Sequence, residues 1–101
     1  MITTANFNTD VLSAETPVLV DFYADWCGPC RALVPKLKAL SEIHGDALRI
    51  VKVDVEEYPD LAAQYSIRSL PTLMTFKSGV VVATHVGMAS NDQLNELVGV
   101  L

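Results

Sequence analysis

The sequence predicts an α/β fold, a mixed sheet with helices on both faces. Two nearly continuous apolar runs rich in β-forming residues, 18–24 and 48–55, have the pattern of strands that are covered on both sides. Two further strands, 72–76 and 80–86, are joined by a hairpin turn at 77–79 and therefore run antiparallel. Segments with apolar residues at helical spacing precede, separate and follow these strands.

The N-terminal half is expected to begin with a short strand at 3–6. A short helix follows, and either Asn6 or Asn8 is expected to cap it. After the first buried strand, a longer helix is predicted over 31–44. Its apolar residues at helical spacing are Leu33, Leu37, Leu40 and Ile43.

The C-terminal half continues the alternation of strands and helices. A helix is predicted over 56–65, before the hairpin, and Gly87 interrupts the chain after it. Either Ser90 or Asn91 is expected to cap the last helix. The resulting order is strand–helix–strand–helix–strand–helix–strand–strand–helix.

Length and charge narrow the classes of function. The 101 residues, half of them hydrophobic, predict a single domain over 1–101 with a sizeable core. A net charge of −5 and scattered basic residues disfavour binding to nucleic acid or to an anionic membrane. No apolar run approaches the roughly 18 residues that cross a bilayer, and the N-terminus has no signal-peptide pattern. A cytoplasmic protein is therefore expected.

Both cysteines of the chain, Cys27 and Cys30, lie between the first buried strand and the helix that follows it. Cys27 is thereby placed at a helix N-terminus, where unpaired N–H groups and the helix dipole favour a thiolate. We expect an exposed Cys27 that attacks disulfides and a less exposed Cys30 that resolves the mixed disulfide. Gly28 and Pro29 form the turn between them.

Two other interpretations of this cysteine pair are a structural disulfide and a metal site. A chain with this much apolar core has little need of a disulfide that closes so short a loop. A zinc or iron–sulfur site takes four ligands. Besides the cysteines only His44 and His85 are available, in distant predicted elements. Redox exchange without a metal is therefore favoured.

Asp21 interrupts an apolar strand that should be covered on both faces. Alternation along the strand places it with Leu19 and Tyr23. A buried carboxyl has a raised pKa, so Asp21 is a candidate base for the Cys30 thiol; the alternative is a carboxylate at a solvated strand end. Lys52 interrupts the next strand, and it either pairs with Asp21 or extends its ammonium to solvent.

Trp26, the only tryptophan, lies in the turn beside the first cysteine and is expected to be partly exposed. An aromatic side chain there can form a docking surface together with Gly28, Pro29 and Leu70. Pro71 begins a strand, where proline is ordinary. Residue types alone do not decide whether the bond before it is cis.

The stretch 18–31, Val-Leu-Val-Asp-Phe-Tyr-Ala-Asp-Trp-Cys-Gly-Pro-Cys-Arg, closely resembles the thioredoxin family. Segments at 51–55, 65–72, 76–79 and 86–87 resemble it in the same order, so the likeness runs nearly end to end. Three departures touch none of the reacting groups. Where many members carry tryptophan, lysine and glycine, this chain has Tyr23, Arg31 and Ser69.

The resemblance implies the thioredoxin fold, a central five-stranded mixed sheet flanked by four helices. It implies that Cys27 is the nucleophile and Cys30 the resolving cysteine. Asp21 would be the buried acid–base group with Lys52 as its neighbour, and Pro71 would be cis and pack against the disulfide. The implied surface for a target's backbone consists of Trp26, Gly28, Pro29, Leu70, Pro71, Gly87 and Met88.

The implied function is that of a general protein-disulfide reductase. Gly-Pro between the cysteines resembles the reducing members of the superfamily, at about −270 mV, and not the oxidising ones near −120 mV. The expected partners are disulfide-containing targets and a thioredoxin reductase that draws on NADPH, with no cofactor on the chain and a monomeric state. The alternatives are a non-catalytic binding subunit on this fold and a disulfide oxidant or isomerase.

Overall fold

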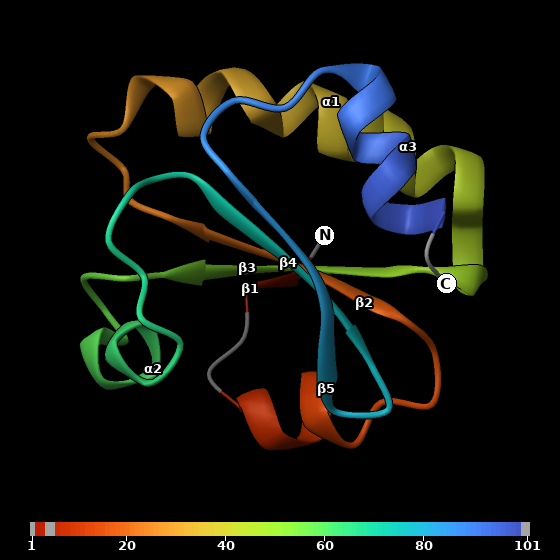
Figure 1. Ribbon diagram of the computed structural model, residues 1–101, viewed down its shortest axis with the longest axis horizontal. Coiled ribbons are helices and arrows are strands. Elements are labelled where there is room, and N and C mark those ends of the chain that lie inside the picture. Colours follow the sequence, from red (N-terminus) through yellow and green to blue (C-terminus); the bar gives the residue numbers. More distant parts are fainter. Residues whose placement is uncertain (1, 4–5, 100–101) are drawn as a thin grey trace.

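The computed structural model describes residues 2–3 and 6–99, which form a five-stranded sheet with helices on both faces (Figure 1). The strands are β1 (Ile2–Thr3), β2 (Val18–Tyr23), β3 (Arg49–Asp54), β4 (Thr72–Lys77) and β5 (Val80–Val86). The helical segments are η1 (Asn8–Leu12), α1 (Gly28–His44), η2 (Gly45–Ala47), α2 (Pro59–Gln64) and α3 (Asn91–Gly99). The predicted α/β class and mixed sheet are confirmed.

The sheet has the strand order β1-β3-β2-β4-β5. β1, β3 and β2 are parallel neighbours, whereas β4 runs antiparallel to both β2 and β5. In Figure 1, α1 and α3 lie on one side of the sheet, and α2 and η1 lie on the other. β2 is therefore the central strand and is covered on both faces, as its apolar run predicts.

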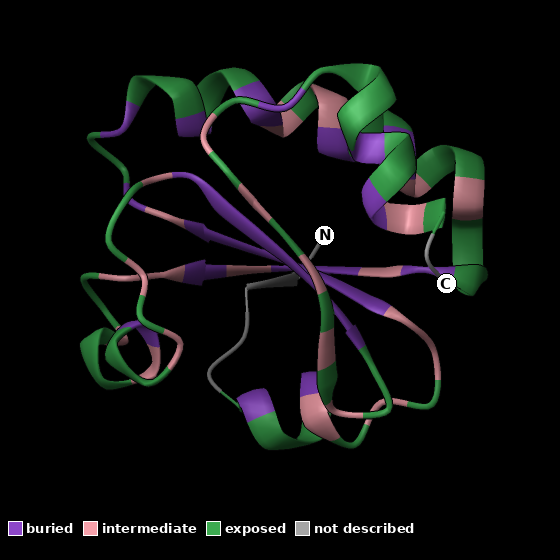
Figure 2. Cartoon of the chain, viewed as in Figure 1, coloured by how far each residue is buried: buried purple, intermediate pink, exposed green. Residues whose placement is uncertain are grey.

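Two apolar cores flank the central strand, one on each face. Leu19 of β2 packs in the cluster that includes Leu33 and Leu37 of α1. Val20 and Phe22 point the other way and pack in the second cluster. Figure 2 shows the buried residues concentrated in the inner strands and on the helix sides that face them. Because side chains alternate along a strand, Asp21 belongs to the α1 face together with Leu19.

The largest differences from the predicted boundaries lie in three elements. The first strand lies at Ile2–Thr3, while residues 4–5 of the predicted strand lie outside the described residues. α1 begins at Gly28 instead of 31, because Pro29 fits the first helical turn. α2 begins only at Pro59. Before it, the Asp54 carboxylate accepts the N–H of Glu56 at 2.9 Å, which favours a turn over a helix at that point.

Of the two predicted caps, the one at the last helix is present. Before η1, the side chain of Asn6 accepts the N–H of Thr9 at 3.4 Å, but the cap position of η1 is Phe7, which makes no side-chain cap hydrogen bond. At the start of α3, the Ser90 hydroxyl accepts the N–H of Gln93, and the Gln93 side chain accepts the N–H of Ser90. This reciprocal pair is a capping box. It fixes the point at which the chain leaves the β5–α3 loop and enters the last helix.

Candidate active site

The two cysteines lie at the junction between the end of β2 and the start of α1. Cys27 caps the helix, and its Sγ accepts the N–H of Cys30 at 3.2 Å. Its own N–H donates to the Ala24 carbonyl at 3.1 Å, which closes the turn after β2. The two cysteines form a disulfide, with Cα atoms 5.2 Å apart. The predicted position at a helix N-terminus is therefore confirmed.

The predicted exposure of Cys27 is wrong for the disulfide form. Cys27 is 4% exposed and Cys30 is 2% exposed, so the expected contrast between them is small. The cause is the cap geometry, because Cys27 Sγ is turned over the first helical turn toward the Cys30 N–H and is bonded to the other sulfur. The exposed groups around the pair are instead Gly28, Pro29 and Trp26, of which Trp26 is 68% exposed.

Asp21 is fully buried on the α1 face of β2. Within the part of the chain that the structure describes, neither of its carboxylate oxygens has a hydrogen-bond partner. Burial raises the pKa of this carboxyl to about 7, and the positive charge of Lys52 partly opposes the rise. The burial and the raised pKa agree with the prediction, and a solvated strand end is excluded.

Lys52 stands directly beside Asp21 in the register of β2 and β3. Its ammonium lies over the ring of Tyr23, with Nζ 4.1 Å from the ring centroid. A cation in this place is attracted by the face of the aromatic ring. The sequence predicted that Lys52 would either pair with Asp21 or extend to solvent, and it did not predict the contact with the Tyr23 ring. Tyr23 was noted there only because many family members have tryptophan at this position. A pocket of about 80 Å³ is bordered by Lys52, Tyr23 and Cys30 among others.

Replacing Lys52 with methionine should raise the pKa of Asp21 above about 7. The ammonium lowers the pKa of this carboxyl, and methionine keeps the length of the side chain without the charge. The pKa is measured from the NMR shift of the Asp21 carboxyl carbon during a pH titration. Lys38→Met, at an exposed position of α1, is the matched control and should leave the titration unchanged. An unchanged or lower pKa in Lys52→Met would contradict the assigned coupling.

The residues expected to receive a target differ in exposure. Trp26 and Met88 are exposed by 68% and 42%, while Leu70 is half-buried. The Leu70–Pro71 bond is cis, and Pro71 itself is buried. The N–H of Gly87 donates to the Pro71 carbonyl at 2.8 Å, which joins the β5–α3 loop to the segment before β4. The structure thus brings Gly87 and Pro71 together.

Arg31 and His85 have contacts that the sequence did not indicate. The Arg31 guanidinium donates to the carbonyl of Asp25 at 2.6 Å and so braces the turn that carries Trp26. His85 hydrogen-bonds the carbonyl of Met88. No pattern in the sequence marks that bond.

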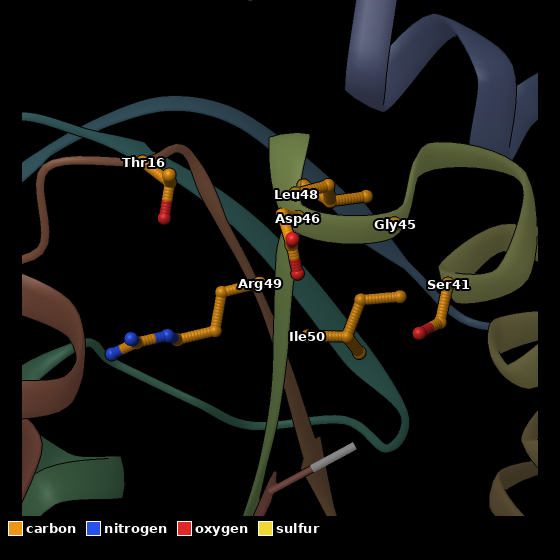
Figure 3. A pocket seen from close by; sticks show the side chains of 7 residues that line it. All are labelled: Thr16, Ser41, Gly45, Asp46, Leu48, Arg49 and Ile50. Atoms are coloured by element: carbon orange, nitrogen blue, oxygen red, sulfur yellow. The ribbon is translucent and has the colours of Figure 1, made fainter.

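A pocket of about 380 Å³ lies at the far end of the sheet (Figure 3). It lies where α1 ends and β3 begins, a helix length of roughly 25 Å from the cysteines. Its lining residues are Thr16, Ser41, Gly45, Asp46, Leu48, Arg49 and Ile50. Arg49 extends away from Ser41 in Figure 3, and its guanidinium donates to the Asp10 carbonyl at 3.0 Å. This pocket therefore has no part in the chemistry of the disulfide.

The described residues contain neither a metal-binding cluster nor a membrane-spanning helix. In 2–3 and 6–99, no three side chains of His, Cys, Asp or Glu gather in a way that suits a metal ion. No helix in the same part of the chain is long and apolar enough to cross a membrane. The cysteines are bonded to each other, so the redox-active group of the site is their disulfide.

Comparison with known proteins agrees with this geometry. The family model described as Thioredoxin matches residues 1–99. The chain belongs to the thioredoxin family. It is 52% identical over 92 residues to "Thioredoxin C-2" of Corynebacterium nephridii, covering 91% of this chain and 85% of that protein. It is 44% identical over 93 residues to "Thioredoxin" of Pseudomonas aeruginosa, covering 92% and 86%.

Membership of the thioredoxin family identifies the activity. The chain is a protein-disulfide reductase that works by thiol–disulfide exchange at Cys27 and Cys30. The redox-active group of a thioredoxin is this disulfide itself, not a bound cofactor. Its partners are accordingly proteins that carry disulfides and proteins that supply electrons.

Proposed function

We propose that this thioredoxin is a general reductase of protein disulfides, in which Cys27 is the nucleophile and Cys30 the resolving cysteine. The observation that carries the proposal is the hydrogen bond from the Cys30 N–H to Cys27 Sγ at the N-terminus of α1. After reduction, the same N–H and the helix dipole favour a thiolate on Cys27.

The exchange proceeds in two steps. The Cys27 thiolate attacks one sulfur of the target disulfide, and the other target sulfur leaves as a thiolate. Cys30 then attacks Cys27 Sγ, which releases the second target thiol and forms the Cys27–Cys30 disulfide. Two electrons pass to the target in the whole cycle. Asp21, with a pKa near neutrality, accepts the proton of Cys30 in the second step.

Lys52 acts in this scheme by tuning Asp21, since its charge lowers the pKa of the carboxyl. The target's backbone docks on a surface made by Trp26, Gly28, Pro29, Leu70, Pro71, Gly87 and Met88. We call these seven residues the docking surface.

A thioredoxin reductase that draws on NADPH returns the disulfide to the dithiol, so the chain needs no cofactor of its own. The chain acts as a single domain and a monomer in the cytoplasm, with no role for nucleic acid or membrane.

The redox potential of the cysteine pair tests the reducing direction. The protein is equilibrated with mixtures of reduced and oxidised glutathione, and the disulfide fraction is read by mass spectrometry. The expected potential is about −270 mV, the value typical of thioredoxins. A potential above about −200 mV would instead favour the disulfide oxidant or isomerase.

A further inference from the structure

The loop from Gly87 to Ser90 has no regular secondary structure, but each of its four residues makes a hydrogen bond to another residue. The N–H of Gly87 donates to the Pro71 carbonyl, and Ser90 is fixed by the capping box with Gln93. Between them, the carbonyls of Met88 and Ala89 each have a side-chain partner from a different element. These two partners, His85 and Lys36, have no role in the exchange chemistry described above.

His85 reaches the loop from β5. It pairs with Leu73 of β4 in the sheet register, and Leu73 belongs to the core on the α1 face. The ring Nε2 lies 2.8 Å from the carbonyl oxygen of Met88. A carbonyl can only accept, so Nε2 must carry a proton, in either the neutral or the protonated ring. The bond holds the Met88 backbone while leaving its side chain 42% exposed.

Lys36 reaches the loop from α1. Its ammonium donates to the Ala89 carbonyl at 3.1 Å, across 53 positions of the sequence. The side chain is half-buried, and Ala89 is 1% exposed, so the contact lies close to the core. α1 is also the helix that Cys27 caps. α1 therefore connects the reacting sulfur to the residue that holds the carbonyl of Ala89.

We propose that His85 and Lys36 are positioning residues that fix the loop 87–89 against Pro71 and α1 and thereby set the affinity for protein targets. The inference rests on the proposed function, because it assigns Gly87 and Met88 to the docking surface. A loop that is already ordered loses little conformational freedom when a peptide binds, so the hydrogen bonds from His85 and Lys36 favour docking. Neither residue touches the sulfurs, so the chemical step itself should not depend on them.

The test uses the full chain, reduced beforehand and mixed rapidly with a disulfide in excess. Insulin is the protein target, and 5,5′-dithiobis(2-nitrobenzoic acid) is a small disulfide that makes no extended contact with a loop. The reaction with insulin is followed by the loss of reduced protein in quenched samples, and the reaction with the small disulfide by the absorbance of the thiolate that it releases. The variants are His85→Phe, which keeps a ring without the donor, and Lys36→Met, which keeps the stem without the ammonium.

Each variant should raise the half-saturating insulin concentration about three- to tenfold, the factor expected from one lost hydrogen bond. The limiting rate constant, the rate with the small disulfide and the equilibrium constant of the cysteine pair with glutathione should each stay within about twofold of wild type. Lys36→Arg restores a donor and should recover most of the insulin affinity. Lys38→Met, two positions further along α1 and exposed, is the matched control and should behave as wild type.

Two results would overturn the inference. One is an equal slowing with insulin and with the small disulfide, which would assign the residues to the chemistry or to general stability. The other is wild-type behaviour of both variants with insulin while urea unfolding shows them folded. If the proposed function itself were wrong, the result would be different, because the wild-type protein would not reduce insulin at all.

Discussion

Replacing Cys27 with serine should reduce the rate of insulin reduction to that of a reaction without the protein. A serine hydroxyl is not ionised at neutral pH and cannot form the mixed disulfide. The chain has only two cysteines, so no third thiol can take over the attack. The rate is followed as NADPH consumption in the presence of a thioredoxin reductase, with insulin as the target.

Cys30→Ser should stop the reaction at a different step, because the attacking thiolate is kept and only the resolving thiol is lost. The protein should accumulate as a mixed disulfide with its target, seen as an added mass under non-reducing conditions. The double variant, with serine at Cys27 and Cys30, is the control and should trap nothing. Substantial turnover by Cys27→Ser, or target trapping by the double variant, would show that the roles are assigned wrongly.

The central part of this fold could be predicted because its signals are local and strong. The apolar run of β2 required cover on both faces, and its alternation alone was enough to place Asp21 on the same side as Leu19, which is the α1 side. The helix after the cysteines followed from spacing, and Pro29 explains why it starts earlier than its apolar pattern does. These conclusions depend on neighbours within one or two turns of the chain.

The remaining features of the site depend on contacts between distant segments, which no local pattern encodes. The bond from Lys36 to Ala89 joins α1 to a loop beyond the hairpin. The position of Lys52 over Tyr23 needs the parallel register of β2 and β3. The low exposure of Cys27 follows from the disulfide and from the direction of its Sγ. Spacing predicted where the thiols lie, but not how much of them is covered.

Asp21→Asn should stabilise the oxidised protein at alkaline pH and leave its stability nearly unchanged at pH 4. Folding raises the pKa of Asp21 from 3.8 to about 7, because the carboxyl is removed from water. Below about pH 3 the group is protonated in both states. As the pH rises from there to about 7, the unfolded chain releases this proton while the folded protein retains it, so the folded state loses stability. A shift of about three pKa units corresponds to a loss of about 4 kcal/mol above pH 7.

The free energy of unfolding is measured by urea denaturation between pH 4 and pH 8, and its difference between variant and wild type should grow by about 4 kcal/mol across that range. Asp46→Asn, at an exposed position in η2, is the matched control and should stay within about 0.5 kcal/mol throughout. A difference that does not change with pH would mean that folding does not raise the pKa of Asp21. Because a buried carboxylate with no hydrogen-bond partner in the described structure is costly at neutral pH, its presence beside Lys52 favours a role in proton transfer over a role in stability.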